Sequence, residues 1–202
     1  MRLGVVNNYR QDNLDIDFKS ARHLAVCARE DFKIKAMLDS ILLSLKSIES
    51  IYILEGGALN AREDSKIESK NVIMLDSNLR DLDSVKEDSY IIIKDYDKAK
   101  NMFIDDYGMN DLQKQFREFI ESSFAKNINI IFFIAKPKQV FAKSKIYEYI
   151  DNFISLNMGG AVDTILKDIN DMLSSNALYH KNFYYNKLTG DITQFRNYSF
   201  IS

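Results

Sequence analysis

Glycine and proline are both scarce in this chain. The 202 residues include seven glycines and one proline, whereas the usual shares are about 7% and about 5%. No glycines have the spacing G-x-G-x-x-G, and none is followed by Lys-Ser or Lys-Thr. Both common phosphate-binding loops need glycine where the backbone approaches the phosphates, so an intact loop of either kind is excluded.

Cysteine, positive charge and long apolar runs are also lacking. The single cysteine, Cys27, cannot form an internal disulfide, which fits a reducing compartment. A net charge of −2 with dispersed lysines offers no basic face for nucleic acid. The longest apolar run, from Ile130 to Ala135, is about a third of the ~20 residues that a membrane span needs. The N-terminal residues lack the apolar core of a signal peptide. We expect one domain over residues 1–202, with no nucleic-acid partner.

Short apolar runs alternate with amphipathic segments, which indicates an α/β domain. The predicted strands are Leu3–Val6, Leu14–Phe18, Leu24–Cys27, Ile51–Leu54, Val72–Leu75, Tyr90–Ile93, Ile130–Ala135 and Phe153–Leu156. Several are continuous β-branched runs, which is typical of parallel strands covered on both faces. The chain is therefore expected to form a mostly parallel sheet flanked by helices.

Apolar residues at helical spacing predict three helices. One follows Asp31 and extends to about Ile48, and a second carries a stripe from Leu112 to Phe124 with Asp111 as its expected cap. A third is expected from about Asp163 to Leu173. The C-terminal part changes to alternation over residues 183–185 and 192–195, which predicts a β-hairpin with its turn around Thr189–Asp191.

The strand Leu24–Cys27 leads through a polar segment into the first helix, which is the context of a P-loop. Aligned with G-x-x-x-x-G-K-[ST], the four key positions hold other residues, in order Ala28, Lys33, Ile34 and Lys35. Glu30 and Asp31 also place carboxylates where phosphate charge would have to lie. These positions therefore mark a degenerate nucleotide site that we expect to be non-functional.

The strand Tyr90–Ile93 ends in the run Lys94-Asp95-Tyr96-Asp97, which has the form of a Walker B element. The carboxylate of such an element orients magnesium or the attacking water. Because strands often end in acids, helix capping or loop hydrogen bonding is an equally good interpretation of Asp95 and Asp97.

The order of these elements resembles the FtsK/SpoIIIE branch of ring-forming ATPases. In that branch a helix is followed by a strand ending in T-Q-R-P, and residues 135–138, Ala-Lys-Pro-Lys, occupy that place and keep the proline. The run Lys94-Asp95-Tyr96-Asp97 is similar to the D-D-Y-D sequence in the last ATPase-like domain of the EccC/EssC family of type VII secretion proteins. Lys94 departs from the first aspartate of that pattern. The resemblance extends from about Ser20 to Phe195 and includes the terminal hairpin.

The resemblance implies a P-loop NTPase-like (FtsK/RecA-like) fold for a single degenerate FtsK-type domain. It further implies a place in a membrane-anchored coupling ATPase, at the cytoplasmic face of the bacterial cell membrane, which this domain reaches only through the parent protein. Its implied partners are neighbouring ATPase domains of the same protein and secreted helical-hairpin substrates of the WXG class. ATP and magnesium belong to the parent family, but the altered loop positions predict that no cofactor and no metal binds here.

Two further groups of residues have competing interpretations. His23 and Cys27 lie four residues apart on one strand face, where a buried structural pair is favoured over a catalytic one. One cysteine and two histidines do not readily supply a zinc site. The C-terminal aromatic residues, which are Phe183, Tyr184, Tyr185, Phe195, Tyr198 and Phe200, fit hairpin packing better than an exposed partner surface.

Three functions therefore remain open from the sequence. The first is a catalytically silent ATPase-like domain that recognises secreted substrates and assembles or regulates a secretion motor. The second is an active enzyme that uses Asp95 or Asp97, either an active or nucleotide-binding NTPase domain of an FtsK-like translocase or a hydrolase. The third is a DNA-associated protein, which the acidic charge balance disfavours.

Overall fold

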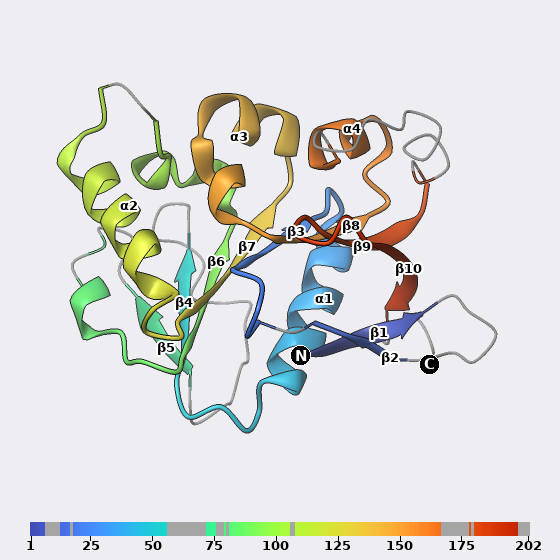
Figure 1. Cartoon of the computed structure of the whole chain (residues 1–202), viewed down its shortest axis with the longest axis horizontal. Helices are drawn as coiled ribbons and strands as arrows, with labels where there is room; N and C mark the ends of the chain where they lie inside the picture. Colours follow the sequence, from blue (N-terminus) through green and yellow to red (C-terminus); the bar gives the residue numbers. More distant parts are fainter. Residues whose placement is uncertain are drawn as a thin grey trace.

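The computed structural model describes residues 1–6, 13–16, 18–55, 72–75, 79, 81–105, 108–166, 178 and 180–197. Within these ranges ten strands form one sheet in the order β2-β1-β10-β9-β8-β3-β7-β6-β4-β5 (Figure 1). The strands are β1 (Arg2–Val6), β2 (Asn13–Asp15), β3 (Leu24–Cys27), β4 (Ile51–Glu55), β5 (Val72–Leu75), β6 (Tyr90–Lys94), β7 (Asn129–Ile134), β8 (Asn152–Leu156), β9 (Asn182–Asn186) and β10 (Ile192–Asn197).

The sheet has a parallel part and an antiparallel part. The neighbours from β5 to β8 in this order pair in parallel, and β9, β10, β1 and β2 extend the sheet in antiparallel pairs. The mostly parallel sheet and its C-terminal hairpin confirm the predicted fold class. The pairing of β1 with β10 was not predicted, because the partner of an N-terminal strand depends on which sheet edge is free.

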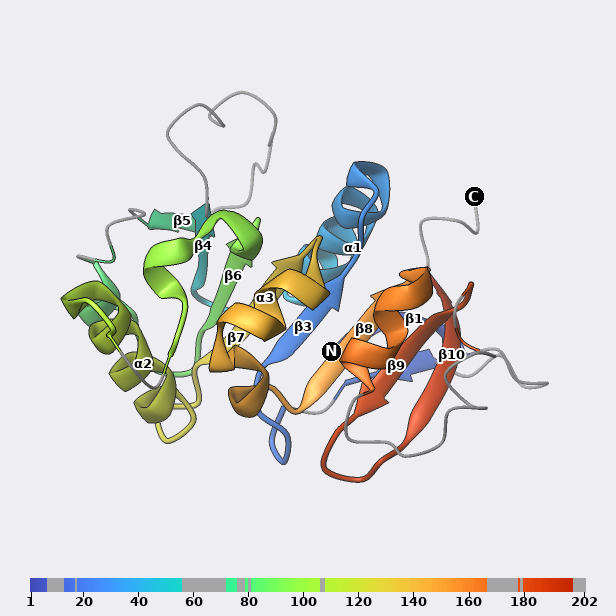
Figure 2. The same cartoon turned by 90° about the horizontal axis from the view of Figure 1, so that it is seen from above.

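Helices cover both faces of the sheet (Figures 1 and 2). The α-helices are α1 (Asp31–Ser44), α2 (Asp111–Ser123), α3 (Pro137–Lys143) and α4 (Val162–Ile165). Short 3-10 helices are η1 (Leu82–Ser84), η2 (Tyr96–Lys98), η3 (Lys100–Met102), η4 (Lys145–Tyr149) and η5 (Gly159–Ala161). Residues of α2, α3 and α4 pack on one face of the sheet, and α1 packs on the other. No helix in the described ranges is long and apolar enough to cross a membrane.

The central strands are buried on both faces, as the apolar runs predicted. Every residue of β3, β7 and β8 is buried. Alternate residues of β3 face opposite helix layers: Ala25 and Cys27 belong to the cluster under α2 and α3, while Leu24 and Val26 belong to the cluster over α1. Two apolar layers therefore hold the parallel strands in place and fix where their ends lie.

The helix ends differ in detail from the sequence prediction. Asn110, not Asp111, caps α2: its side chain accepts a hydrogen bond from the Gln113 amide, and the Gln113 side chain accepts one from the Asn110 amide. Asp111 is instead the first helical residue, where its charge is favourable at the positive end of the helix dipole. α3 was not predicted, and the expected helix from Asp163 to Leu173 lies partly outside the described residues.

The predicted hairpin is present, and its turn has a local explanation. The Asn186 side-chain oxygen accepts hydrogen bonds from the amides of Leu188 and Thr189. Gly190 follows with φ of 77°, a backbone conformation that glycine adopts without steric cost. The turn therefore reverses the chain at the position that the sequence indicated.

Candidate functional site

The candidate nucleotide positions lie along one edge of the sheet. Strands β3, β7 and β6 are parallel neighbours, with β7 between the other two. Their carboxyl ends therefore meet at the same edge, where ligands commonly bind in open α/β sheets (Figure 2). This edge brings together the connection after β3, the acidic segment after β6 and the start of α3.

The connection from β3 to α1 consists of Ala28, Arg29 and Glu30 only. Ala28 is fully buried, and its amide donates to the Ile134 carbonyl at 3.1 Å, which extends the pairing of β3 with β7. Helix α1 begins at Asp31, so Lys33, Ile34 and Lys35 lie in its first turns. The predicted loop positions are thus divided between a strand extension and a helix.

Acidic groups stand at the start of α1. The Glu30 carbonyl accepts hydrogen bonds from the amides of Lys33 and Ile34 at 2.9 and 3.1 Å. The Lys33 ammonium pairs with the Glu30 carboxylate at 2.7 Å. Asp31 is exposed in the first turn. Carboxylates at a helix N-terminus are stabilised by the helix dipole, and they repel a phosphate at the same place.

The two aspartates after β6 have different surroundings. Asp95 has a left-handed backbone with φ of 51°, and its half-exposed carboxylate pairs with Lys98 at 3.1 Å. Asp97 instead accepts hydrogen bonds from the amides of Ala135 and Lys136, each at 2.6 Å. The Asp97 carboxylate thus links the segment after β6 to the carboxyl end of β7. This is the loop hydrogen bonding that was one of the two interpretations of Asp97 from the sequence.

Asp97→Asn is expected to lower the free energy of unfolding by about 1.5–3 kcal/mol, since hydrogen bonds to a charged acceptor contribute about that much. An asparagine amide has one acceptor oxygen, and its NH2 group would oppose the second backbone N–H. Asp95→Asn is the matched control and should change stability by less than about 0.5 kcal/mol, because its ion pair is exposed. Urea unfolding of both variants measures the difference, and equal losses would contradict the assigned role of Asp97.

Tyr96, between the two aspartates, is completely buried. Its hydroxyl donates to the Met102 carbonyl at 2.8 Å, and its ring packs against Phe132 and Phe103. Burial raises the pKa of this hydroxyl, which therefore stays protonated. The central residue of the acidic run is thus a packing residue that fixes the path of η2 and η3.

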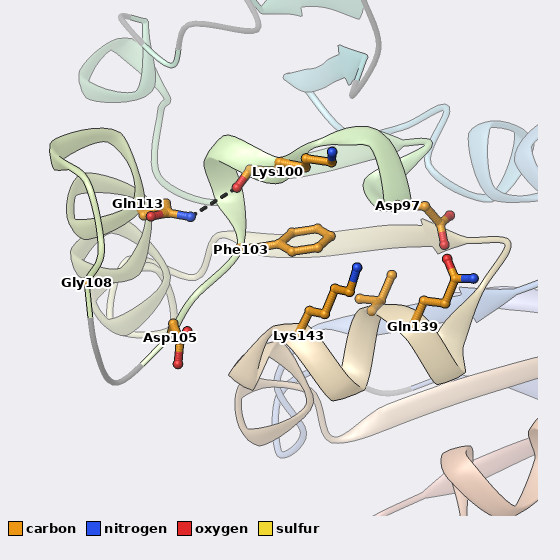
Figure 3. Close-up of a pocket in the computed structure, with 9 residues that line it drawn as sticks. Asp97, Lys100, Phe103, Asp105, Gly108, Gln113, Gln139 and Lys143 are labelled. Carbon is orange, nitrogen blue, oxygen red and sulfur yellow. Dashed lines mark hydrogen bonds between the residues drawn. The ribbon is translucent and has the colours of Figure 1, made fainter.

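A cavity of about 540 Å³ opens beside Asp97, between the η2–η3 segment and α3 (Figure 3). Its lining residues are Asp97, Lys100, Phe103, Asp105, Gly108, Gln113, Gln139, Val140 and Lys143. Among them, the sequence predicted a place in the nucleotide site for Asp97 alone. The two lysines are 43 positions apart and belong to no motif, so no pattern in the chain could have found the cavity.

The structural interpretation of His23 and Cys27 fits their burial, 1% and 0% exposed. The His23 Nδ1 accepts a hydrogen bond from the Ile130 amide at 3.1 Å, and its Nε2 lies 3.3 Å from the Ser123 hydroxyl. Burial raises the pKa of the Cys27 thiol, which keeps it protonated and unreactive. Within the described ranges, no three His, Cys, Asp or Glu side chains are grouped as a metal site.

The C-terminal aromatic residues pack mainly into the core. Phe183, Tyr185 and Phe195 are at most 2% exposed, and Tyr185 stacks on Phe153. Tyr184 is also buried, and its hydroxyl donates to Asn152 at 2.6 Å. Tyr198 and Phe200 lie outside the described residues. For the described aromatic residues, hairpin packing is therefore confirmed.

No protein-family model and no curated protein matches the chain by comparison. Solved structures do match. EccC of Thermomonospora curvata (ATPases 2 and 3, in complex with a signal sequence peptide) has a TM-score of 0.64 at 10% identity, over 98% of this chain and 40% of EccC. EssC of Geobacillus thermodenitrificans (ATPases 2 and 3) has a TM-score of 0.61 at 9% identity, over 98% and 44%. The genome packaging NTPase B204 of Sulfolobus turreted icosahedral virus 2, in complex with ATP-gammaS, has a TM-score of 0.60 at 13% identity, over 88% and 97%.

These likenesses agree on one architecture at very low identity. The chain spans less than half the length of the EccC and EssC chains that it matches. The likeness to the viral NTPase covers nearly the whole of that protein, so the two share one overall fold. The chain therefore has the fold of the P-loop ATPases, which EccC and EssC share.

Proposed function

We propose that this chain is a catalytically silent ATPase-like domain of a type VII secretion coupling protein. In this role it recognises secreted helical-hairpin substrates of the WXG class and assembles with, or regulates, neighbouring ATPase domains. It reaches the cytoplasmic face of the cell membrane only through the parent protein. The observation that supports the proposal most is the three-residue connection between β3 and α1.

A short connection argues against phosphate binding for a geometric reason. A P-loop holds phosphates with several consecutive backbone N–H groups in a glycine-rich turn before the helix. Here Ala28 continues the strand ladder and Glu30 is already the N-cap of α1. Only Arg29 remains between them, and the carboxylates of Glu30 and Asp31 stand where a phosphate would approach. Nucleotide and magnesium do not fit these residues.

The acidic segment supports the same proposal. Magnesium in a nucleotide site is bound by one or two carboxylates together with phosphate oxygens. The Asp97 oxygens each accept a backbone N–H at 2.6 Å, and Asp95 is paired with Lys98. The place in a secretion machine is supported by the likeness to EccC and EssC. The EccC structure holds a signal sequence peptide.

Calorimetric titration of the chain with MgATP tests the silent part of the proposal. We expect no measurable heat of binding, because the backbone cradle is missing. Micromolar affinity would contradict the proposal and favour the NTPase alternative. In that case turnover should disappear in Asp95→Asn and persist in Asp39→Asn, a matched change at an exposed aspartate of α1.

Regulation of a neighbouring domain needs a separate test. A domain without catalysis can still shift a population of ring arrangements if substrate binds it more strongly in one of them. Rates of ATP hydrolysis by the longer coupling protein, with and without this domain, should then differ when a WXG-class substrate is present. Equal rates and equal stimulation by substrate would contradict the regulatory role.

A further inference from the structure

The cavity beside Asp97 has walls from several separate segments, one of which is α2 through Gln113. Lys100 and Phe103 come from the η3 region, while Gln139, Val140 and Lys143 come from α3. The connection between β3 and α1 contributes no lining residue. The cavity is therefore distinct from the degenerate nucleotide position, although Asp97 lies at the boundary between the two.

The walls of the cavity are held in place by hydrogen bonds. At the end of α3, the Ser144 hydroxyl accepts from the Ile104 amide at 2.9 Å, and the Lys145 amide donates to the Ile104 carbonyl at 2.7 Å. On the other side, the Gln113 side chain donates to the Lys100 carbonyl at 3.1 Å. Because these hydrogen bonds already hold the backbone on both sides, binding of a ligand would cost little conformational entropy of the backbone.

The charges around the cavity are unequally compensated. The side chains of Lys100 and Lys143 make no hydrogen bond or ion pair with any described residue. The Asp97 carboxylate already accepts two backbone amides, and in Figure 3 Asp105 points away from the lysines. Two ammonium groups without a partner among the described residues therefore line a concave surface, which favours an anion there.

An apolar surface lies next to these charges. In the view of Figure 3 the Phe103 ring lies between the two lysine side chains, and Val140 of α3 also lines the cavity. The ring is itself positioned by Tyr96, at a centroid distance of 5.4 Å. A half-buried aromatic ring beside cations offers a stacking face as well as charge, so a planar organic group fits it better than a bare ion.

We propose that this cavity binds a small organic anion. Its charged group lies between the Lys100 and Lys143 ammonium groups, and its planar apolar part packs against Phe103 and Val140. A phosphate ester and a carboxylate share this chemistry. The site is independent of the proposed secretion role, and it gives the domain a ligand-binding activity that does not require a phosphate loop.

Titrations of the whole ¹⁵N-labelled chain with phenyl phosphate, with benzoate and with inorganic phosphate test the proposal by NMR. We expect saturable shifts at Phe103 and along α3 for at least one aromatic anion, and at least about 10-fold weaker binding of inorganic phosphate, which lacks the ring. The stronger of the two aromatic anions identifies the charged group of the ligand as a phosphate ester or a carboxylate. No saturable binding of either would overturn the proposal.

Substitutions assign the binding to the lysines. Lys143→Met and Lys100→Met each keep an apolar side chain but remove the charge. Each should lower the affinity for the aromatic anion about 10-fold or more. Lys138→Met, on the same helix but outside the cavity, and Arg29→Met, in the β3–α1 connection, should leave its affinity unchanged. Affinity that is unchanged in both cavity variants, or that falls only in Arg29→Met, would overturn the proposal. ATP is itself a phosphate ester with a planar ring, so MgATP binding that is lost in Lys143→Met but kept in Arg29→Met belongs to this cavity. Binding that is lost only in Arg29→Met belongs to the degenerate nucleotide position, so the two proposals can fail separately.

Discussion

Asp151→Asn is expected to lower the free energy of unfolding by about 2–3 kcal/mol, since a buried carboxylate loses charge-assisted hydrogen bonds from a partly exposed arginine. The Asp151 carboxylate is 1% exposed. Its Oδ2 accepts from both the amide and the Nε of Arg22, at 2.8 and 2.9 Å, and its Oδ1 accepts from Nη2 at 3.2 Å. An asparagine would turn an NH2 group toward one set of these donors.

The position of Asp151 explains why this loss should affect the whole sheet. The residue precedes β8, Arg22 precedes β3, and the Lys187 amide in the hairpin turn donates to the Asp151 carbonyl at 2.7 Å. The carboxylate therefore joins the starts of the parallel neighbours β3 and β8, and its Oδ1 also lies 4.0 Å from the Lys187 ammonium of the hairpin. Hydrogen bonding to Asp151 also raises the pKa of the Arg22 guanidinium, because the bond favours its charged form.

Urea unfolding of Asp151→Asn, Arg22→Met, the double variant and a control at Asp39 checks this role. Asp39→Asn removes an exposed carboxylate and should cost less than about 0.5 kcal/mol. Arg22→Met combined with Asp151→Asn should cost less than the sum of the single changes, because both remove one interaction. Additive losses, or a midpoint for Asp151→Asn equal to that of the Asp39 control, would contradict the prediction.

The parallel core could be predicted from the sequence because its signal is local. The strand at Leu24–Cys27 was predicted with the bounds that β3 has, since a buried parallel strand is a short apolar run that ends at polar residues. Helix α3 could not be predicted in the same way. It has seven residues, and Pro137 suits its first position, but the run is too short for a helical periodicity to emerge.

The candidate site, like the fold, could be predicted only in part from the sequence. The sequence located the strand ends that carry Ala28 and Asp97, because strand, loop and helix follow one another along the chain. It could not show that Ala28 continues a ladder or that Asp97 binds two amides of a segment 38 and 39 positions away. Lys100 and Lys143 were missed because only the packing of α3 against the η3 region brings them to one cavity.

Acidification is expected to destabilise the fold through His23, by about 2–3 kcal/mol at pH 4.5 relative to pH 7.5. Burial, reinforced by the nearby Arg22 charge, lowers the pKa of His23 to about 4, whereas the unfolded chain titrates near 6.5. Between these values the unfolded state binds the proton and the folded state does not. Stability is therefore complete above pH 6.5 and falls as the pH decreases toward 4.

His23→Asn isolates this contribution from the carboxylates that titrate in the same range. Asparagine tolerates the left-handed backbone of position 23, where φ is 44°, and its Oδ1 can accept the Ile130 amide as Nδ1 does. The variant should lose less stability than the original chain between pH 7.5 and 4.5, by about 2–3 kcal/mol in urea unfolding. His180→Asn, at an exposed turn before β9, should keep the original pH profile. If His23→Asn and the original chain lose the same unfolding free energy between pH 7.5 and 4.5, the buried neutral imidazole is not the cause of the acid destabilisation.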